Sequence, residues 1–461
     1  MGKERVLQNL VVPKKRDSER LLWVNPYGWL DRDHSSNGVN GVAQEGVERL
    51  RQRGLDIVTV GPHVGDDIYN VADIRVGNAL ELPLILAKIM GTDFPLSLPF
   101  RKERVASLML AAEPDSAFME QPDQGFAGHS FISGTQIGED GQTLIPVMAR
   151  FHSAIYNQTA DFLYRSFIKS LKLARRPRFT KIGVTDGVTN TVLNNLQLCI
   201  VTSKAIKKVS EMRYGKREYK LLPNGIDVDK FTPQGPIIEE WRRDGKEIVL
   251  IAMGRIEKRK GVIYGLEAYR IIKAKRPNTK LMILGKDSPE RKKLEKKVIS
   301  ERIKDVHFVG RLSRKEYEMA LRTADVGIYA AIGGEGWGIV IGEGLASGLL
   351  SVVSNISGYD EVTEGGQPFA LMAEPKNPPD IAAKTLKILS FSQEVKQNLK
   401  LEAAEYIRSR FAWDIIIDQL SGHIQSVLNN RIKVNWEQAR EKYANKPKFF
   451  PPSGTLFVAK K

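Results

Sequence analysis

The sequence has only one cysteine, Cys199, among 461 residues. A single thiol cannot form an internal disulfide, and the apolar residues around it indicate a small, buried hydrophobic side chain. The N-terminus has no apolar segment that could direct secretion, and Val6 stands where a myristoylation motif needs Ser or Thr. We therefore expect the protein to remain in the cytoplasm.

Long apolar runs are also missing, so we expect no membrane-spanning segment. The longest uncharged stretch, residues 187–203, is rich in Asn and Thr, and the apolar region at 326–354 is interrupted by Glu335 and Glu343. The sequence has no His-Glu-x-x-His, no paired Cys-x-x-Cys and no Gly-x-x-x-x-Gly-Lys-Ser/Thr. Zinc hydrolases and P-loop enzymes are therefore not supported.

The composition has no extreme feature except its charge. Hydrophobic residues make up 42% of the chain, aromatic residues 8% and charged residues 27%, which is typical of a soluble globular protein and excludes disordered and fibrous classes. The 70 Lys and Arg residues exceed the 54 Asp and Glu residues, which gives a formal net charge of +16. Such a surplus favours anionic partners: nucleic acid, an acidic membrane surface or phosphorylated ligands.

Strand and helix patterns alternate along the chain. An apolar strand at 21–24 is followed by a loop that extends to Gly41, an amphipathic helix from Val42 to near Gly54, and a strand at 57–60. The second half repeats this alternation, with strands at 248–253, 280–284, 307–309, 326–329 and 351–354 and helices at 262–273, 290–300, 314–322 and 342–347. Such alternation is typical of doubly wound parallel sheets.

We therefore predict an α/β protein with two Rossmann-like, doubly wound lobes that face a cleft. Pro233, Gly235 and Pro236 interrupt the periodicity and mark the boundary between the lobes. The expected domains cover 1–235 and 236–430, the second ending in a helix at 413–428, and a basic C-terminal extension covers 431–461. Ligands of such lobes bind at the carboxyl ends of the strands.

A basic turn follows the strand at 248–253 and opens the next helix. It begins at Gly254, ends at Gly261 and contains Arg255 and Lys260. Glycine allows a tight turn, the free N–H groups of a helix N-terminus attract an anion, and each cation can neutralise a phosphate. A solvated basic turn is the alternative, but the position at the end of a strand favours a phosphate site.

Two carboxylates, Glu335 and Glu343, flank a glycine-rich junction between a strand and a helix. On one continuous helix, residues at this spacing would lie about 12 Å apart. That separation suits the two ends of one elongated ligand better than a close acid-base pair. Because the run between them carries no charge, each carboxylate needs a polar partner.

Several motifs in the second half occur in a recognisable order. They are Pro223-Asn224-Gly225-Ile226-Asp227 with Phe231, the turn from Gly254 to Gly261, Gly310-Arg311, the segment from Glu335 to Glu343 with Ala346-Ser347-Gly348 after it, and the segment from Gly358 to Glu361. Together they resemble the retaining glycosyltransferases of the GT-B fold, in particular those of family 4. Ordered motifs of this number are hard to obtain by chance.

The resemblance implies a role for each matching residue. Arg255 and Lys260 would hold the diphosphate of a nucleotide-sugar donor. Glu335 would contact the transferred sugar and act in catalysis, and Glu343 would bind the ribose hydroxyls. The other residues that it implies are Gly336, Trp337, Gly338 and Ile339 through their backbone N–H groups, Val309 and Gly310 near the base, and, in the first lobe, Gly41 at the donor and His152 in catalysis.

The resemblance also implies a reaction that retains the anomeric configuration and needs no metal or other cofactor. The donor would be a UDP- or GDP-linked sugar, and the acceptor a hydroxyl group of a glycan or a lipid-linked sugar. The charge that develops on the leaving diphosphate would be stabilised by Arg255, Lys260 and a helix N-terminus. The one attractive Asp-x-Asp, Asp227-Val228-Asp229, lies inside a loop motif that is already assigned, so we expect no metal site.

A basic segment at 162–181 predicts an amphipathic helix. Its helical projection places Arg165, Lys169, Lys172 and Arg176 on one side and Leu163, Phe167, Leu171 and Ala174 on the other. Two interpretations stay open. The helix docks on an anionic membrane, where a lipid-linked acceptor would lie, or it packs on the core and its basic face is solvated.

Two other functions remain as alternatives. The net charge of +16 fits a nucleic-acid-binding or membrane-binding protein on a similar scaffold, although the sequence has no recognisable nucleic-acid module. A sugar-nucleotide epimerase would share the two-lobe fold and the phosphate site, so the fold alone does not exclude it. Product analysis separates an epimerase from a transferase.

Overall fold

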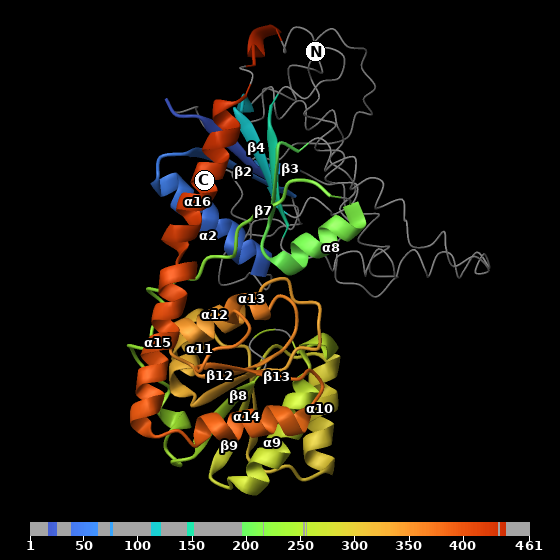
Figure 1. The fold of residues 1–461 in the computed structure, drawn as a ribbon, viewed down its shortest axis with the longest axis vertical. Coiled ribbons are helices and arrows are strands. Elements are labelled where there is room, and N and C mark those ends of the chain that lie inside the picture. The colour runs from blue at the N-terminus through green and yellow to red at the C-terminus, as the bar shows by residue number, and fades with distance from the viewer. Residues whose placement is uncertain are drawn as a thin grey trace, which may run out of the picture. The chain divides into compact units, whose positions relative to one another are not determined.

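The computed structural model describes residues 17–24, 38–62, 74–76, 112–120, 145–151, 196–214, 216–251, 254, 256–431 and 434–438. The chain divides into two compact units (Figure 1). One unit contains Met1–Thr202, Ile206–Leu222 and Ile417–Lys461, and the other contains Ser203–Ala205 and Pro223–Ile416. The boundary thus follows Leu222, whereas the sequence places it at 235.

The first unit is built on a seven-stranded sheet with the order β3-β2-β1-β4-β5-β6-β7. The strands are β1 (Arg20–Val24), β2 (Asp56–Pro62), β3 (Ile74–Val76), β4 (Ser116–Glu120), β5 (Val147–Phe151), β6 (Leu198–Val201) and β7 (Lys220–Leu221). All their pairings are parallel. The interior strand β1 is buried along its whole length, as expected for a parallel strand that is covered on both faces.

Two helices of this region, α2 (Gly38–Gln52) and α8 (Lys204–Tyr214), follow β1 and β6. Val42, Val47 and Leu50 of α2 are buried, which confirms the predicted amphipathic helix. Gly54 follows this helix with a φ of +90°, a conformation that favours glycine. Cys199 is buried in β6, as predicted, and burial raises the pKa of its thiol to about 11.

A fully buried ion pair joins two neighbouring strands of the first unit. Arg150 of β5 donates to both carboxylate oxygens of Glu120, the last residue of β4, at 2.6 and 3.1 Å. Neither side chain is exposed to solvent. The indole of Trp23 also donates to Glu120, at 3.2 Å. The pair therefore links β1, β4 and β5 near the carboxyl ends of the strands.

The second unit is built on a six-stranded parallel sheet with the order β10-β9-β8-β11-β12-β13. The strands are β8 (Glu247–Ile251), β9 (Thr279–Leu284), β10 (Val306–Gly310), β11 (Val326–Tyr329), β12 (Ser351–Ser354) and β13 (Ala370–Ala373). The helices are α9 (Val262–Lys275), α10 (Pro289–Ser300), α11 (Arg314–Thr323), α12 (Ile339–Ala346), α13 (Asp360–Thr363), α14 (Pro378–Leu389) and α15 (Gln393–Phe411). Each unit is thus a doubly wound, Rossmann-like α/β fold, as predicted.

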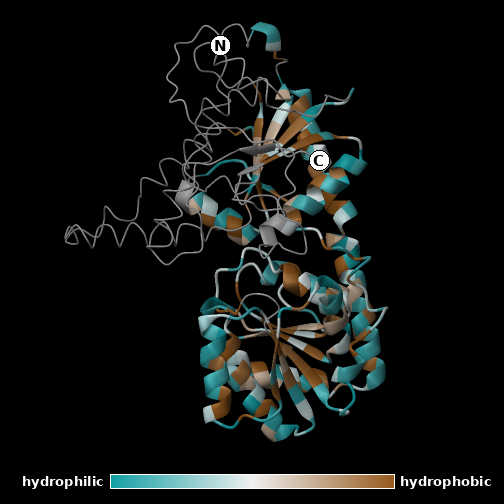
Figure 2. Cartoon of the chain, turned by 180° about the vertical axis from the view of Figure 1, so that it is seen from behind, coloured by the Kyte–Doolittle hydropathy of each residue, from teal (hydrophilic) through white to brown (hydrophobic). Residues whose placement is uncertain are grey.

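Helices cover both faces of the second sheet. Figure 1 shows α9 and α14 on one side of the strands and α11 and α12 on the other. The strands are predominantly hydrophobic, whereas the outer faces of the helices are hydrophilic (Figure 2). The core of this unit therefore consists of the two faces of the sheet and the inward sides of its helices.

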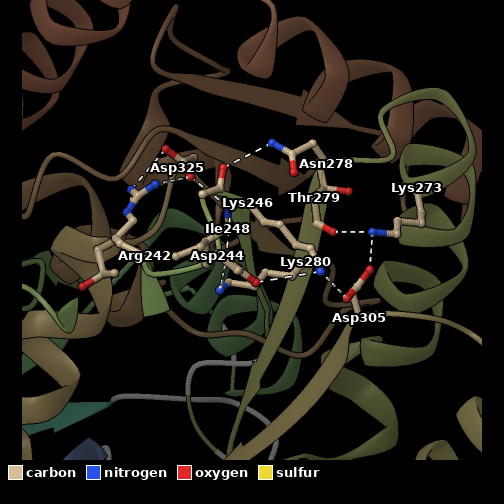
Figure 3. A network of polar contacts seen from close by, with 12 residues as sticks. Arg242, Asp244, Lys246, Ile248, Lys273, Asn278, Thr279, Lys280, Asp305 and Asp325 are labelled. Carbon is tan, nitrogen blue, oxygen red and sulfur yellow. Dashed lines mark hydrogen bonds and ion pairs between the residues drawn. The ribbon is translucent and has the colours of Figure 1, made fainter. Parts of the chain in front are cut away.

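A network of charged side chains lies at the amino ends of the central strands (Figure 3). Asp325, just before β11, accepts a hydrogen bond from the N–H of Ile248 at 2.7 Å and pairs with Arg242 at 2.8 Å. Asp305, just before β10, pairs with Lys246 at 2.6 Å and with Lys273 at 2.5 Å. These contacts connect the segments that precede the strands, at the end of the sheet opposite the carboxyl ends of the strands.

The last long helix, α16 (Trp413–Asn429), begins in the second unit, and its residues from 417 onward belong to the first. In the first unit, Asp418 pairs with Arg53 at 2.8 Å. Arg431 pairs with Glu19 at 2.7 Å and with Asp115 at 3.2 Å. The sequence assigned this helix to the second domain, and these contacts explain the difference. Among the described residues, no helix has the length and hydrophobicity needed to cross a membrane.

Candidate functional site

The carboxyl ends of β8 and β11 form the switch point of the second sheet. The chain proceeds from β8 to β9 and β10 on one side, and from β11 to β12 and β13 on the other. Loops that follow adjacent strands at such a point diverge and leave a place for a ligand. The two constellations predicted from the sequence follow β8 and β11, so the topology brings them to this point.

A backbone contact joins these two loops. Ile332, after β11, donates its N–H to the carbonyl of Arg259, after β8, at 2.9 Å. Gly261, at the start of α9, has a φ of +62°, and a Cβ there would lie 2.0 Å from the carbonyl oxygen of Ala330. Only glycine fits so close to another backbone. The glycine that ends the basic turn is therefore required by the contact between the loops.

Glu335 is held by two cations from the basic turn. The Nζ of Lys260 lies 2.9 Å from Oε1 of Glu335, and Arg259 pairs with the same oxygen. Arg259 also pairs with Glu257 at 2.9 Å. Burial works against the charged form of Arg259, but the two carboxylates outweigh it and raise the pKa of the guanidinium. Lys260, which the sequence predicts to bind phosphate, thus lies beside Glu335, which it predicts to contact the sugar. Arg259 is a second cation at the same carboxylate, and the sequence did not predict it.

The backbone N–H groups directly after Glu335 differ in their hydrogen bonding. The N–H groups of Gly336, Trp337 and Gly338 make no hydrogen bond to another described residue, whereas the N–H of Ile339 donates to the carbonyl of Trp337 at 2.9 Å. Three of the four predicted backbone donors thus have no partner within the described part of the chain, and all three residues are buried. The indole of Trp337 is buried against Phe411, so this residue would act through its backbone alone.

The second carboxylate, Glu343, lies within α12 and is 7% exposed. Its Oε1 accepts a hydrogen bond from Arg314 at 3.1 Å, and its Oε2 accepts one from the hydroxyl of Tyr317 at 3.2 Å. Burial raises the pKa of Glu343, and both partners oppose that shift. The polar partner that the sequence requires is thus supplied by α11.

Val309 and Gly310 lie at the end of β10, at the same edge of the sheet. Gly310 has a φ of +91°, and its carbonyl accepts a hydrogen bond from Gly285 at 2.9 Å. The guanidinium of Arg291 lies over the ring of Phe308 at 5.6 Å. Because β9 separates β10 from β8, these residues stand beside the switch point rather than at it.

Several predicted residues cannot be placed in the site. Arg255, His152 and the basic segment 162–181 lie outside the described residues. Gly41 is exposed in the first turn of α2, not in the loop before the helix, and a Cβ there would meet no atom within 4 Å. The described residues thus show no close contact that would demand glycine at this position.

The structure also shows contacts that the sequence did not reveal. Arg259 stands in a basic run and could have been found there, but nothing in the sequence connects Arg314 and Tyr317 with Glu343. Within the described ranges, no three His, Cys, Asp or Glu side chains come together as ligands for a metal ion. Asp227 of the Asp-x-Asp sequence is buried and pairs with Lys230 at 2.7 Å.

Comparison with known proteins gives a consistent result. Residues 234–406 match the family described as Glycosyl transferases group 1. A phosphatidyl-myo-inositol mannosyltransferase of Mycobacterium tuberculosis is 27% identical over 217 residues, 46% of this chain and 55% of the relative, so the chain spans about half of that protein. The corresponding protein of Mycobacterium leprae is 27% identical over 398 residues, 86% of this chain and 95% of the relative.

A solved structure shares the fold over nearly the whole chain. The Anabaena protein HepE in complex with UDP superposes with a TM-score of 0.67, over 88% of this chain and 100% of that one. The sequence identity is 15%, so this likeness concerns the fold alone.

Proposed function

We propose that this chain, whose residues 234–406 match the Glycosyl transferases group 1 family and whose two Rossmann-like units have the GT-B fold, is a hexosyltransferase that uses a nucleotide-sugar donor. The main observation behind the proposal is the ion pair between Lys260 and Glu335 at the switch point of the second sheet. A cation and a carboxylate at adjacent positions can serve the phosphate and the sugar of one donor, which are themselves adjacent.

The donor would lie across the loops after β8 and β11. Lys260, together with Arg255, would neutralise the diphosphate, and the unpaired N–H groups of Gly336, Trp337 and Gly338 would donate to phosphate or sugar oxygens. The neighbour from Anabaena is described in complex with UDP, which supports UDP as one candidate carrier. GDP is the other.

The reaction that we propose retains the anomeric configuration and does not depend on a metal ion. The bond between the anomeric carbon and the diphosphate oxygen breaks, and the electron pair stays on the diphosphate. The acceptor oxygen bonds to the same face of that carbon, and its proton passes to the departing phosphate. Lys260 and the backbone donors would stabilise the charge that develops on the leaving group.

We infer that the acceptor is a hydroxyl group of a glycan or a lipid-linked sugar. The relatives are named for a phosphatidyl-myo-inositol acceptor, which supports a lipid-linked one. The net charge of +16 would favour contact with an anionic membrane surface, to which segment 162–181 could contribute. The protein would then act in the cytoplasm, at the inner face of the membrane. Nucleic acid is the less supported acceptor.

Differential scanning fluorimetry with UDP, GDP, ADP and their common sugar conjugates tests the proposal. A ligand that binds only the native state raises its melting temperature, so one nucleotide should produce a clear shift. Incubation of that donor with a lipid-linked acceptor should then yield a glycosylated product. Conversion of the donor without an acceptor would instead indicate an epimerase. No shift with any nucleotide, beside salt-sensitive binding to anionic vesicles or oligonucleotides, would indicate a binding protein.

A further inference from the structure

Helix α11 provides both partners of the buried carboxylate of Glu343. Arg314 and Tyr317 are three residues apart and therefore project from the same side of the helix. The start of this helix is fixed by a capping box, in which Ser313 and Glu316 exchange hydrogen bonds between side chain and backbone. The position of both partners is thus determined by the fold and not by the flexibility of a loop.

An aromatic ring keeps the two partners in place. Phe231 is 1% exposed, and the guanidinium of Arg314 lies 4.4 Å from the centre of its ring. Tyr317 meets the same ring edge-on, with centroids 6.0 Å apart. Because these contacts restrict the rotamers of both side chains, their donor groups are already oriented before any ligand binds.

The carboxylate of Glu343 has hydrogen-bond acceptor positions that Arg314 and Tyr317 do not use. A carboxylate offers about four lone-pair positions, two on each oxygen. Arg314 occupies one on Oε1 and Tyr317 occupies one on Oε2, so each oxygen can still accept one further hydrogen bond. Two neighbouring hydroxyl groups match two acceptors fixed in this manner. Glu318, on the same helix, also lies near Arg314, at 3.9 Å, and Asp227 acts on the same guanidinium.

We infer that Arg314 and Tyr317 are positioning residues that orient Glu343 to accept both hydroxyl groups of a vicinal diol, the ribose of the nucleotide. The inference rests on the proposed function, since it assigns the diol to the donor. Both positioning residues would act through Glu343. Their effect therefore falls on nucleotide binding, and it depends on the ribose hydroxyls.

Isothermal titration calorimetry of the full chain tests the inference. UDP, GDP and ADP are titrated first, and the one that binds is compared with its 2′,3′-dideoxy analogue in the wild type and in Tyr317→Phe. We expect the variant to bind the ribonucleotide about three- to tenfold more weakly, because one hydrogen bond that orients the carboxylate is lost. The dideoxy analogue should bind the variant and the wild type equally.

A matched control is Tyr269→Phe. Tyr269 is a buried tyrosine of the same unit, and its hydroxyl donates to the carbonyl of Thr279 at 3.1 Å, at the amino ends of the strands. This variant should bind both nucleotides like the wild type. A second test variant, Arg314→Lys, keeps the positive charge but loses the planar donor groups of the guanidinium. It should also bind the ribonucleotide more weakly than the wild type does, and bind the dideoxy analogue equally well.

The outcomes separate the inference from the proposed function. If Tyr317→Phe and Arg314→Lys lower the affinity for the ribonucleotide and for the dideoxy analogue equally, or lower neither affinity, the positioning role is wrong. The proposed nucleotide site is not affected by that result. If the wild type binds none of the three nucleotides, the proposed function fails, and the inference fails with it. That result is visible before any variant is measured.

Discussion

The Nζ of Lys260 lies 2.9 Å from Oε1 of Glu335, although the two residues come from loops after different strands. In a nucleotide sugar, the bond that breaks joins the phosphate to the anomeric carbon. A cation for the phosphate and a carboxylate for the sugar must therefore be close together. The pairing of these two residues meets that requirement, and it does so at the point where the topology of the sheet leaves room for a ligand.

Replacement of Lys260 by Ala should weaken donor binding by about 1.5 to 3 kcal/mol, the usual contribution of a charge-assisted hydrogen bond. Calorimetric titration with the nucleotide diphosphate measures it. Glu335 keeps Arg259 as a partner, so the fold should persist. Lys258→Ala is the matched control, because Lys258 is exposed in the same turn. Equal affinities in the wild type and both variants would remove Lys260 from the phosphate site.

Glu335→Gln should lower kcat by about a hundredfold, since the neutral amide cannot supply the charge that the carboxylate presents to the reacting sugar. Circular dichroism and donor affinity should change little. The comparison is a steady-state assay of Glu335→Gln beside Glu402→Gln, whose side chain is exposed on α15. Turnover at the wild-type rate in Glu335→Gln would exclude this residue from catalysis.

Much of the second unit follows from local patterns. The strand at 326–329 and the strand at 351–354 have the predicted bounds, because short segments rich in apolar residues between turn residues are typical of buried parallel strands. The helix predicted at 342–347 instead begins at Ile339. Gly342 and Gly344 weaken the helical pattern there, so the start of the helix depends on packing rather than on propensity.

Contacts between elements could not be predicted in the same way. The spacing of Glu335 and Glu343 indicated that each needs a partner, but periodicity within one helix does not say which residues of another helix face it. Arg314 and Tyr317 became visible only in three dimensions. The same holds for α16, which has residues in both units and forms pairs, such as Asp418 with Arg53, that join residues far apart in the sequence.

The charged network at the amino ends of the strands predicts a pH dependence of stability. Hydrogen bonds from Lys246 and Lys273 lower the pKa of Asp305 from 3.8 to about 2. Because the folded-state pKa is depressed, the stabilisation is fully present above the unfolded pKa and is lost as the pH falls from about 4 to about 2. Asp305→Asn should therefore destabilise the protein by about 1 to 2 kcal/mol at pH 7.

Urea unfolding of the wild type and Asp305→Asn between pH 7 and pH 2 measures this effect. The difference between the two proteins should shrink as the pH falls from about 4 to about 2, because Asp305 becomes neutral in the unfolded state and about half neutral in the folded state. Asp287→Asn serves as the control, since Asp287 is exposed and lies 3.9 Å from Lys292. A difference that stays constant down to pH 2 would contradict the assigned role of Asp305.

The buried pair in the first unit gives the largest expected effect on stability. Arg150 and Glu120 are both fully buried, so Glu120→Gln leaves a guanidinium without a counter-charge in the core. We expect a loss of about 3 to 5 kcal/mol. The double variant Glu120→Leu with Arg150→Met removes both charges of the pair and should recover part of this loss, because a buried pair is costly to break but can be replaced by apolar side chains. Thermal and urea unfolding measure both.

An exposed pair of the same unit provides the comparison. Asp418→Asn removes the partner of Arg53, whose pairing carboxylate is 68% exposed, and should cost less than about 1 kcal/mol. If Glu120→Gln costs no more than Asp418→Asn, the pair is not desolvated as the structure indicates. If the double variant is as unstable as Glu120→Gln alone, then the shape of the pair, together with its contact to Trp23, matters more than the compensation of charge.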